Sequence, residues 1–429
     1  MSNIITDYAD CQACEDEDLT EELHDKFEPK KRAALVLADS YKRLAADIPA
    51  FCTKEQRVRE CGTFTRWRRP LFPADMLPKP NPREHSRAGR SGASREQGER
   101  GADGWKLFEA NFCRDRLCPM CSWRRTYKIF GQVSRIMDCI GSDYEFIFLT
   151  LTVPNCSGSD LARVIDDMEY AFNHRLLRNT RFKAAVCGYF KALEITHNTD
   201  LYRCKVVKTK NGKKRKIVIT DENGIPLSNP NYDTYHPHFH IILAVKKSYF
   251  NGKNYIKHDE WLEMWRTATK NPNITQVDVR KVKAKSEIAE GEQGVKSLDS
   301  AVAEAAKYSV KDSDFLGKYD ASGELVKPFP FEFMDNTVFW LSGALYGRRL
   351  CSFGGCFSDV RKKLKLDDIE YGDLVVTSDG SELRADVAYM IRTYSWSCGA
   401  YKLTETSIER PAVDVLISAD DDVEEFPDV

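Results

Sequence analysis

The sequence YHPHFHIILAV, residues 235–245, places His238 and His240 at the start of an apolar run. A short apolar run of this kind predicts a buried β-strand. Because alternate residues of a strand point to the same face, the two imidazoles lie side by side. Phe239 and Ile241 then face the core. Two neutral imidazoles on one sheet face are half of a divalent metal site, and ordinary exposed strand histidines are the alternative.

A carboxylate for the same site comes from the preceding predicted strand, residues 186–196, which carries Glu194 between two apolar residues. Glu194 would complete a three-ligand set that leaves coordination positions open for phosphate and water. Two alternatives stay open. In the first, Glu194 is a plain exposed glutamate. In the second, His236 is the third ligand, because residues 236, 238 and 240 alternate along the strand and so point to the same face. Pro237 argues against His236, since a proline can end the strand there.

A glutamate and a tyrosine come together on a predicted helix over residues 297–311, SLDSAVAEAAKYSVK. At about 100° per residue, Glu304 and Tyr308 are one turn apart, so their side chains are neighbours. A tyrosine hydroxyl can attack phosphorus and hold a covalent phosphodiester, and an adjacent carboxylate can activate a water molecule. Alone, such a pair is usually a solvated helix face. The metal site predicted upstream favours the catalytic interpretation.

Four cysteines have the spacing of a zinc site. Cys113, Cys118 and Cys121 lie close together in the chain, and Cys61 lies upstream. Knuckles of this kind with a fourth, distant cysteine suit a tetrahedral structural Zn²⁺. We therefore predict zinc bound by these four thiolates. Buried free thiols are the alternative, and the CQAC motif at residues 11–14 competes for the fourth position.

Five short motifs occur in an order that is found in a known family. They are FCRDRLCPMCSWRR at 112–125, FLTLTVP at 148–154, LEIT at 193–196, HPHFHIIL at 236–243 and EAAKYSVKDSDF at 304–315. With these motifs the chain resembles rolling-circle plasmid replication initiators, which are Rep proteins of the HUH endonuclease superfamily. The similarity is to the branch with one tyrosine followed by a short lysine-bearing run, and it covers about residues 61–366.

The resemblance implies an enzyme that nicks one strand at a plasmid double-strand origin. It implies Tyr308 as the nucleophile, Mg²⁺ or Mn²⁺ as the catalytic metal, and a protein that stays joined to the 5′ phosphate. It further implies that Glu304 serves the terminating cleavage. A conjugative relaxase or a single-strand transposase has the same histidines and tyrosine, but the cysteine block before the sheet favours the plasmid initiator. A non-catalytic zinc-containing DNA-binding protein is the alternative from another class.

Charge is strongly segregated along the 429 residues, although the net charge is only −1. Residues 205–216 carry seven basic side chains and no acidic one, whereas residues 411–429 carry seven acidic side chains and no basic one. The motif Asn211-Gly212 predicts a hairpin in the basic segment. Local basic patches matter more than net charge for phosphate binding. The predicted DNA contacts are Lys213, Lys214, Arg215, Lys216 and Lys311.

The order of strands and helices predicts an α+β fold, with an HUH-type antiparallel sheet flanked by helices. Four segments are expected. They are an acidic N-terminal segment and helix, 1–50; a cysteine-rich zinc-binding unit, 51–128, with a disordered loop over 78–104; the HUH endonuclease domain, 140–315; and an α-rich C-terminal region with an acidic tail, 316–429. The loop is expected to be disordered because it has hardly an apolar residue to bury.

Composition predicts a cytoplasmic protein with reduced thiols. The chain has 14 cysteines, a hydrophobic fraction of 42%, no apolar run of membrane-spanning length and no signal-peptide pattern. It also has no P-loop motif, so we expect it to nick DNA but not to unwind it. The expected partners are plasmid origin DNA, both double-stranded and single-stranded, a host helicase and the host replication machinery, with no membrane.

Overall fold

The computed structural model describes residues 19, 23–71, 104–208, 214–283, 295–307, 309–375 and 389–409. The chain forms two compact units, neither of which is contiguous in sequence. The first consists of Met1–His24, Thr63–Asn111 and Asp379–Val429, and the second of Asp25–Gly62 and Phe112–Ser378. The four-segment division expected from the sequence stays a prediction.

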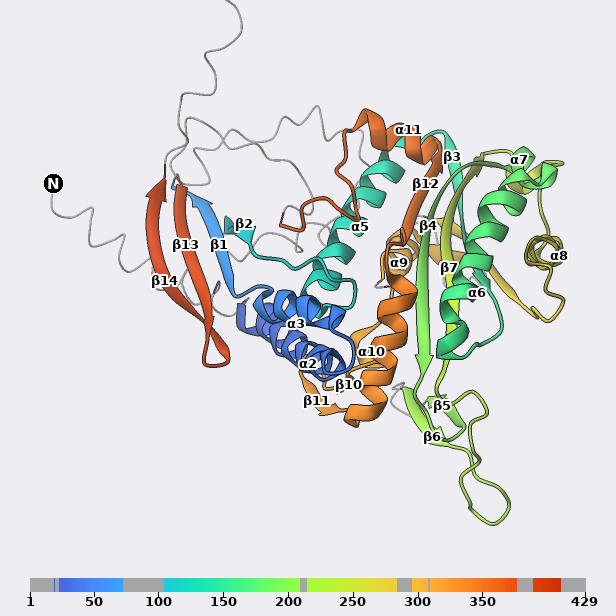
Figure 1. Cartoon of the computed structure of the whole chain (residues 1–429). Coiled ribbons are helices and arrows are strands. Elements are labelled where there is room, and N and C mark those ends of the chain that lie inside the picture. Colours follow the sequence, from blue (N-terminus) through green and yellow to red (C-terminus); the bar gives the residue numbers. More distant parts are fainter. Residues whose placement is uncertain are drawn as a thin grey trace, which may run out of the picture. The chain divides into compact units, whose positions relative to one another are not determined.

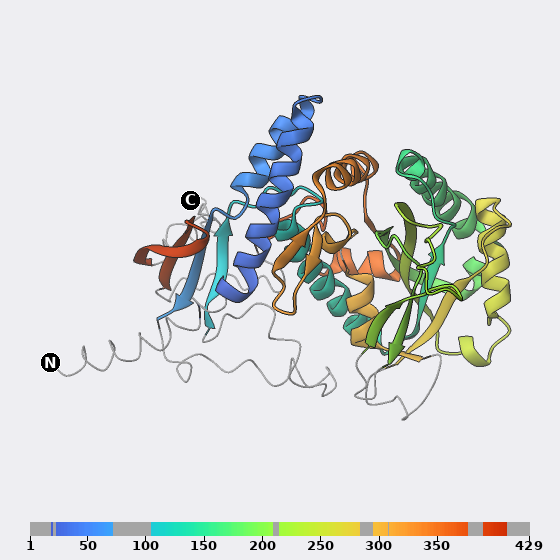
Figure 2. The ribbon, with the colours of Figure 1, turned by 90° about the horizontal axis from the view of Figure 1, so that it is seen from below.

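A six-stranded sheet forms the centre of the second unit (Figure 1, Figure 2). Its strands, in spatial order, are β12 (Cys351–Gly355), β4 (Val186–Asn198), β7 (Thr234–Lys246), β3 (Tyr144–Thr152), β8 (Val277–Lys283) and β9 (Val295–Ser297). All neighbours are antiparallel except β8 and β9, which are parallel. Aromatic and β-branched residues are frequent in the long strands β3, β4 and β7, which agrees with their strand propensity. The predicted α+β arrangement with a mostly antiparallel sheet is confirmed.

Strand β7 has a partner on each side, and this pairing determines where its histidines point. His238 is opposite both Glu194 of β4 and Thr152 of β3, and His240 follows on the same face. The strand continues through Pro237, so the expectation that the proline ends it is wrong. Proline is tolerated there because β3 ends at Thr152, opposite His238, so no residue of β3 is opposite Pro237.

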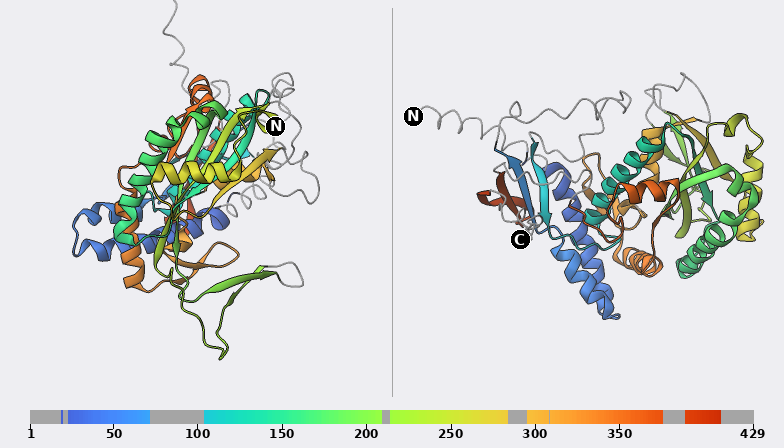
Figure 3. Two further views of the ribbon diagram at one scale, coloured as in Figure 1. Left: turned by 90° about the vertical axis from the view of Figure 1, so that its right-hand side faces the viewer. Right: turned by 90° about the horizontal axis from the view of Figure 1, so that it is seen from above.

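Helices cover both faces of this sheet (Figure 3). The face that carries the histidines is covered by α5 (Pro119–Ile140), α9 (Leu298–Ala305) and α11 (Cys356–Lys363), and the other face by α6 (Gly158–Tyr170) and α8 (His258–Thr269). On that second face, the ring centroids of Trp265 of α8 and Phe239 are 6.4 Å apart. Phe239 therefore points away from the face of the histidines, as the alternation of side chains along the strand predicts. Phe239 and Trp265 are fully buried.

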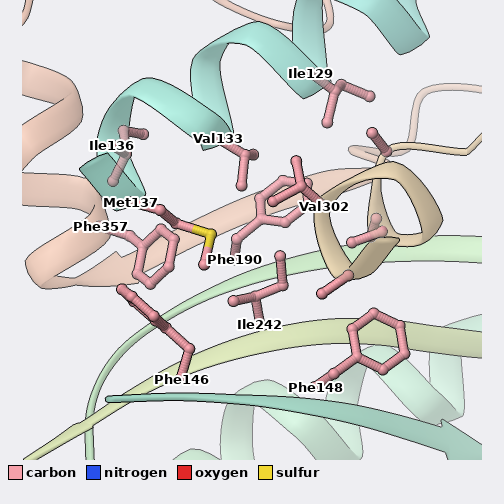
Figure 4. Packing of buried hydrophobic residues seen from close by; sticks show 14 of the residues in the cluster. Ile129, Val133, Ile136, Met137, Phe146, Phe148, Phe190, Ile242, Val302 and Phe357 are labelled. Atoms are coloured by element: carbon pink, nitrogen blue, oxygen red, sulfur yellow. The ribbon is translucent and has the colours of Figure 1, made fainter. Parts of the chain in front are cut away.

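The core between the sheet and the first group of helices is apolar (Figure 4). Val133 of α5 and Val302 of α9 are fully buried in it, and so are Phe190 of β4 and Ile242 of β7. Complete burial of an aliphatic or aromatic side chain contributes about 1.5–3 kcal/mol. This packing holds α9, and with it Glu304, against the sheet.

The second unit has further elements around this core. They are α2 (Glu28–Ala45), α3 (Ala50–Glu60), α7 (Thr180–Ala185), α10 (Phe331–Leu345), the strand pair β5 (Cys204–Lys208) and β6 (Lys214–Val218), the strand pair β10 (Gly317–Tyr319) and β11 (Leu325–Pro328), and the short turns η3 (Ala171–Arg175), η4 (Leu176–Arg178), η5 (Tyr249–Asn251) and η7 (Asp312–Asp314). A π-helical turn, η1 (Leu23–Phe27), precedes α2. None of the described helices is both long and apolar enough to span a bilayer.

The first unit contains a four-stranded antiparallel sheet in which strands within residues 64–110 pair with strands within residues 389–409. Its strands, in spatial order, are β14 (Ala400–Glu409), β13 (Tyr389–Ser397), β1 (Phe64–Pro70) and β2 (Lys106–Ala110). The expectation of an α-rich C-terminal region is therefore wrong, because the described residues after 316 form five strands, β10 to β14, besides two helices. The segment YMIRTYSWS shows why, since its β-branched and aromatic residues favour a strand.

Candidate active site

Three buried side chains from neighbouring strands converge on the helix-covered face of the sheet. Oε2 of Glu194 lies 2.7 Å from Nε2 of His240 and 3.3 Å from Nε2 of His238. One ligand atom from each residue lies within 4.8 Å of the other two, so the group could hold a metal ion. Each residue is at most 9% exposed. The alternative that these are ordinary exposed strand residues is therefore wrong.

The hydrogen bonds behind the histidines orient both rings. Nδ1 of His238 donates to the carbonyl oxygen of His236 at 3.1 Å, and Nδ1 of His240 lies 3.2 Å from the hydroxyl of Thr150. With each Nδ1 engaged in this way, each Nε2 is left to face Glu194, which is the arrangement that metal-binding histidines use. Of the two candidates for the third ligand, the geometry groups Glu194 with the pair, and the ring of His236 stays outside the group.

Burial and hydrogen bonding favour the ionisation states that a metal ion needs. Burial alone would raise the pKa of Glu194, but its contacts with the imidazoles of His238 and His240 outweigh this and hold that pKa below the usual range. Burial also lowers the pKa of the His240 imidazole, despite the nearby carboxylate. An ionised carboxylate and a neutral imidazole are the forms that bind a divalent metal.

Glu304 of α9 lies at the edge of this cluster. Its Oε1 is 4.0 Å from Nδ1 of His240, and its Oε2 accepts a hydrogen bond from the ammonium group of Lys296 on β9. Burial works to raise the pKa of Glu304, but the ion pair with Lys296 more than offsets this and lowers the pKa. Glu304 is therefore held as a carboxylate beside a candidate metal ligand.

The helix that carries Glu304 is shorter than predicted. It ends at Ala305, so the expectation that Glu304 and Tyr308 lie one turn apart on a common helix is wrong. The helix stops because the chain then turns to strand β4, where the carbonyl oxygen of Ser309 accepts a hydrogen bond from the amide of Ile195 at 2.7 Å. Tyr308 itself lies outside the described residues.

Lys311 also reaches the candidate metal ligands. Its ammonium nitrogen lies 3.4 Å from Oε1 of Glu194, and its side chain is 44% exposed. The segments before and after Tyr308 thus both contact the cluster, one through Glu304 and the other through Lys311. An exposed cation in this place can meet a phosphate oxygen.

The four predicted cysteines form one buried cluster. The sulfur of Cys61 lies 3.5 Å from that of Cys121 and 3.6 Å from that of Cys118, and the sulfurs of Cys113 and Cys121 are 3.6 Å apart. A tetrahedral zinc with Zn–S bonds of about 2.3 Å needs sulfur atoms roughly 3.8 Å apart. The cluster could therefore hold a metal ion. The competing motif at residues 11–14 lies outside the described residues.

Positive partial charges surround the cysteine cluster. The amide of Cys113 donates to the sulfur of Cys61 at 3.3 Å, and the amide of Arg114 donates to the sulfur of Cys121 at 3.2 Å. Lys31 of α2 is fully buried, and its ammonium donates to the carbonyl oxygen of Cys61 at 2.7 Å. Such donors stabilise the negative charge that metal-bound thiolates carry.

Apart from Lys311, the basic residues predicted to contact DNA belong to the β5–β6 hairpin, which extends beyond the end of the six-stranded sheet (Figure 1). Arg215 and Lys216 are exposed. Lys216 forms a salt bridge with Asp200, so part of its charge is already balanced. Lys213 and the side chain of Lys214 lie outside the described part of the chain.

Sequence reasoning missed three residues that support the two clusters, Lys296 doing so through Glu304. Thr150 could have been found, because FLTLTVP places polar residues on one face of a buried strand. Nothing in the sequence indicates that Lys31 and Lys296 are buried, since most lysines are exposed to solvent. Only the packing shows that these two are 0% and 7% exposed.

Comparison with known proteins identifies the family of the chain. The profile of a family described as replication protein matches residues 104–402. "Protein rep" of Bacillus amyloliquefaciens is 33% identical over 379 residues, which is 86% of this chain and 91% of that protein. "Protein rep" of Streptococcus pneumoniae serotype 2 is 34% identical over 282 residues, which is 65% of this chain and 71% of that protein. No solved structure matches. The chain therefore belongs to the Rep family of rolling-circle replication proteins.

Proposed function

We propose that this Rep protein is an HUH endonuclease that nicks one strand of a plasmid double-strand origin with Tyr308 as the nucleophile. One observation carries the proposal: a buried cluster of Glu194, His238 and His240 lies where the segment around Tyr308 meets the sheet. Lys311, three residues after the tyrosine, contacts the same cluster. Metal ligands, a phosphate-binding cation and a nucleophile are the parts that metal-assisted phosphoryl transfer needs.

The first cleavage makes a covalent protein–DNA link. Mg²⁺ or Mn²⁺ bound to Glu194, His238 and His240 would polarise the scissile phosphate and neutralise its developing charge. The Tyr308 hydroxyl gives its proton to solvent and its oxygen forms a bond to phosphorus, while the bond between phosphorus and the 3′ oxygen breaks. The 3′ oxygen takes up a proton and leaves as a free hydroxyl. The 5′ phosphate stays on Tyr308, which keeps a phosphodiester available for rejoining.

Termination needs a second cleavage while Tyr308 is already joined to DNA. We assign the general base of that step to Glu304. A water oxygen forms a bond to phosphorus, the bond to the 3′ oxygen breaks, and the proton of the water passes to the Glu304 carboxylate. The leaving 3′ oxygen takes up a proton from solvent. The position of Glu304 beside His240 supports this role, because the carboxylate lies next to a candidate metal ligand.

A covalent adduct is the product that tests the proposed function. The protein is incubated with supercoiled plasmid that carries its origin, in the presence of Mn²⁺, and the reaction is denatured. We expect nicked plasmid with protein attached to the 5′ end of the cut strand. Binding of origin DNA without nicking or an adduct would instead identify a non-catalytic DNA-binding protein. Cleavage specific for a transfer origin or a transposon end would identify a relaxase or a transposase.

The four-cysteine cluster has a structural role in this proposal. We infer that it binds one Zn²⁺ through Cys61, Cys113, Cys118 and Cys121. Four thiolate ligands leave no coordination position for substrate, so the ion would stabilise the fold and not take part in cleavage. The cluster joins α3, which ends next to Cys61, to α5, which begins next to Cys118.

Replacing Cys118 by Ser is expected to remove the zinc and to destabilise the second unit. Native protein should contain about one zinc per chain, and the variant close to none, because a closed site loses its affinity with one ligand missing. Elemental analysis and thermal unfolding measure both effects. Cys139→Ser, an exposed cysteine on the same helix α5, is the matched control and should keep both the zinc and the stability. Zinc-free native protein that is fully folded would contradict the assignment.

Neutralising the hairpin cations is expected to weaken DNA binding and to reduce its dependence on salt. The changes are Lys213→Gln, Lys214→Gln, Arg215→Gln and Lys216→Gln. The slope of log K against log salt concentration should become shallower by about 0.7–0.9 for each phosphate that the variant no longer neutralises. The exposed pair Lys246 and Lys247, at the other end of β7, is the control and should change neither quantity. An unchanged affinity and slope in the hairpin variant would show that the hairpin is a solvated insertion.

A further inference from the structure

Lys296 is a buried cation on the sheet face that carries the candidate metal ligands. It belongs to the three-residue strand β9, which pairs in parallel with β8 so that Lys296 is opposite Val282. Val282 is part of the apolar core beneath α9. Lys296 is only 7% exposed, and burial of an ammonium group is costly unless the charge is paired. A lysine in this position therefore needs a specific partner.

Two contacts hold the Lys296 ammonium in place. It donates a hydrogen bond to Oε2 of Glu304, and it lies 3.8 Å from the centroid of the Phe148 ring. Phe148 is fully buried, and its ring centroid is 5.4 Å from that of His240. A cation over an aromatic face is attracted by the ring quadrupole. Phe148 thus holds the Lys296 ammonium on the side of the cluster where Glu304 lies.

Glu304 depends on Lys296 for its position. The 4.0 Å separation between its Oε1 and Nδ1 of His240 is too long for a hydrogen bond. Its side chain is 31% exposed and lies in the last turn of α9, where a glutamate can also turn towards solvent. The salt bridge to Lys296 is the contact that keeps the carboxylate turned to the metal ligands.

We propose that Lys296 is a positioning residue that holds the Glu304 carboxylate against the metal-ligand cluster for the second cleavage. The inference rests on the proposed function and adds a residue to it. Lys296 does not touch the DNA or the water in this role. Its contribution is geometric, because a general base acts only within hydrogen-bond reach of the proton that it removes.

The test isolates the second cleavage. Protein is first joined through Tyr308 to an unlabelled single-stranded origin oligonucleotide, and the adduct is purified. An origin oligonucleotide labelled at its 5′ end is then added with Mn²⁺, and the shortened labelled product is measured over time. We expect Lys296→Met to lower the rate of this step about tenfold or more, because a misplaced general base loses most of its effect. Formation of the first adduct should fall much less.

The chain offers a closely matched control in Lys281 on the neighbouring strand β8. Its ammonium also pairs with a glutamate, Glu145, at 3.1 Å, and also lies over an aromatic ring, that of Phe250, at 4.1 Å. Lys281 precedes Val282, the residue opposite Lys296, so the two lysines point to opposite faces of the sheet. Lys281→Met should leave the second cleavage at the wild-type rate, whereas Lys296→Arg should recover part of the rate that Lys296→Met loses.

A double variant separates positioning from an independent effect of Lys296. In a Glu304→Ala background, Lys296→Met should cause no further loss, since residues that act as one unit are not additive. Equal losses in the presence and absence of Glu304 would overturn the inference. So would a wild-type second cleavage in Lys296→Met, given that wild-type protein forms the Tyr308 adduct. A wild-type protein that forms no such adduct would overturn the proposed function and the inference together.

Discussion

Tyr308→Phe is expected to form no covalent adduct with origin DNA, and to nick it roughly 10³-fold more slowly or not at all. Phenylalanine differs from tyrosine by the hydroxyl alone, so the change removes the proposed nucleophile and leaves the metal ligands and the basic hairpin in place. Affinity for origin DNA and the temperature of unfolding should stay at wild-type values. Denaturing electrophoresis after incubation with origin plasmid and Mn²⁺ measures the adduct.

A second tyrosine provides the control for this experiment. Tyr346 is 80% exposed at the end of α10, and Tyr346→Phe should nick and form an adduct at the wild-type rate. Mass spectrometry of the digested adduct identifies the modified residue. If the DNA were found on another tyrosine and Tyr308→Phe stayed active, the assignment of the nucleophile would be wrong.

Loss of either histidine is expected to have the second-largest effect. His238→Ala and His240→Ala should each lower nicking about 100-fold or more at ordinary Mg²⁺ or Mn²⁺ concentrations. Each change removes one of three ligands, and an ion held less tightly no longer neutralises the charge that develops on the phosphate. Glu194→Ala should weaken metal affinity in the same assay. Nicking rates measured over a range of metal concentrations separate weaker metal binding from slower chemistry.

His258 is the matched control, because it is a half-exposed histidine on α8 outside the cluster. His258→Ala should keep both the rate and the metal dependence of the wild-type protein. Full activity in EDTA, or in the double variant of His238 and His240, would exclude a metal role. If Glu194→Ala kept the wild-type metal dependence, His236 would become the better third ligand.

Local patterns in the sequence were enough for the main strands and for the histidine pair. The predicted strand at 186–196 is β4, which extends two residues further, and the predicted strand at 235–245 is β7, which extends one residue further at each end. These predictions succeed because side-chain periodicity depends on neighbours along the chain. The same reasoning failed after Ala305, where the alanine-rich segment predicts more helix than forms. There, a hydrogen bond from Ile195 to Ser309 joins the segment to the sheet and overrides its helical propensity.

The sequence by itself determined which residues are able to perform chemistry: two histidines on one strand face, a cysteine knuckle and a glutamate four residues before a tyrosine. These features are local, so spacing along the chain reveals them. The tertiary structure showed which of the distant candidates lie beside each group, and it alone revealed the pairing of Lys296 with Glu304. It brought Glu194 to the histidines in preference to His236, Cys61 to the other cysteines, and Lys296 to Glu304. Such contacts depend on strand register and on helix packing, which bring together residues that no local pattern connects.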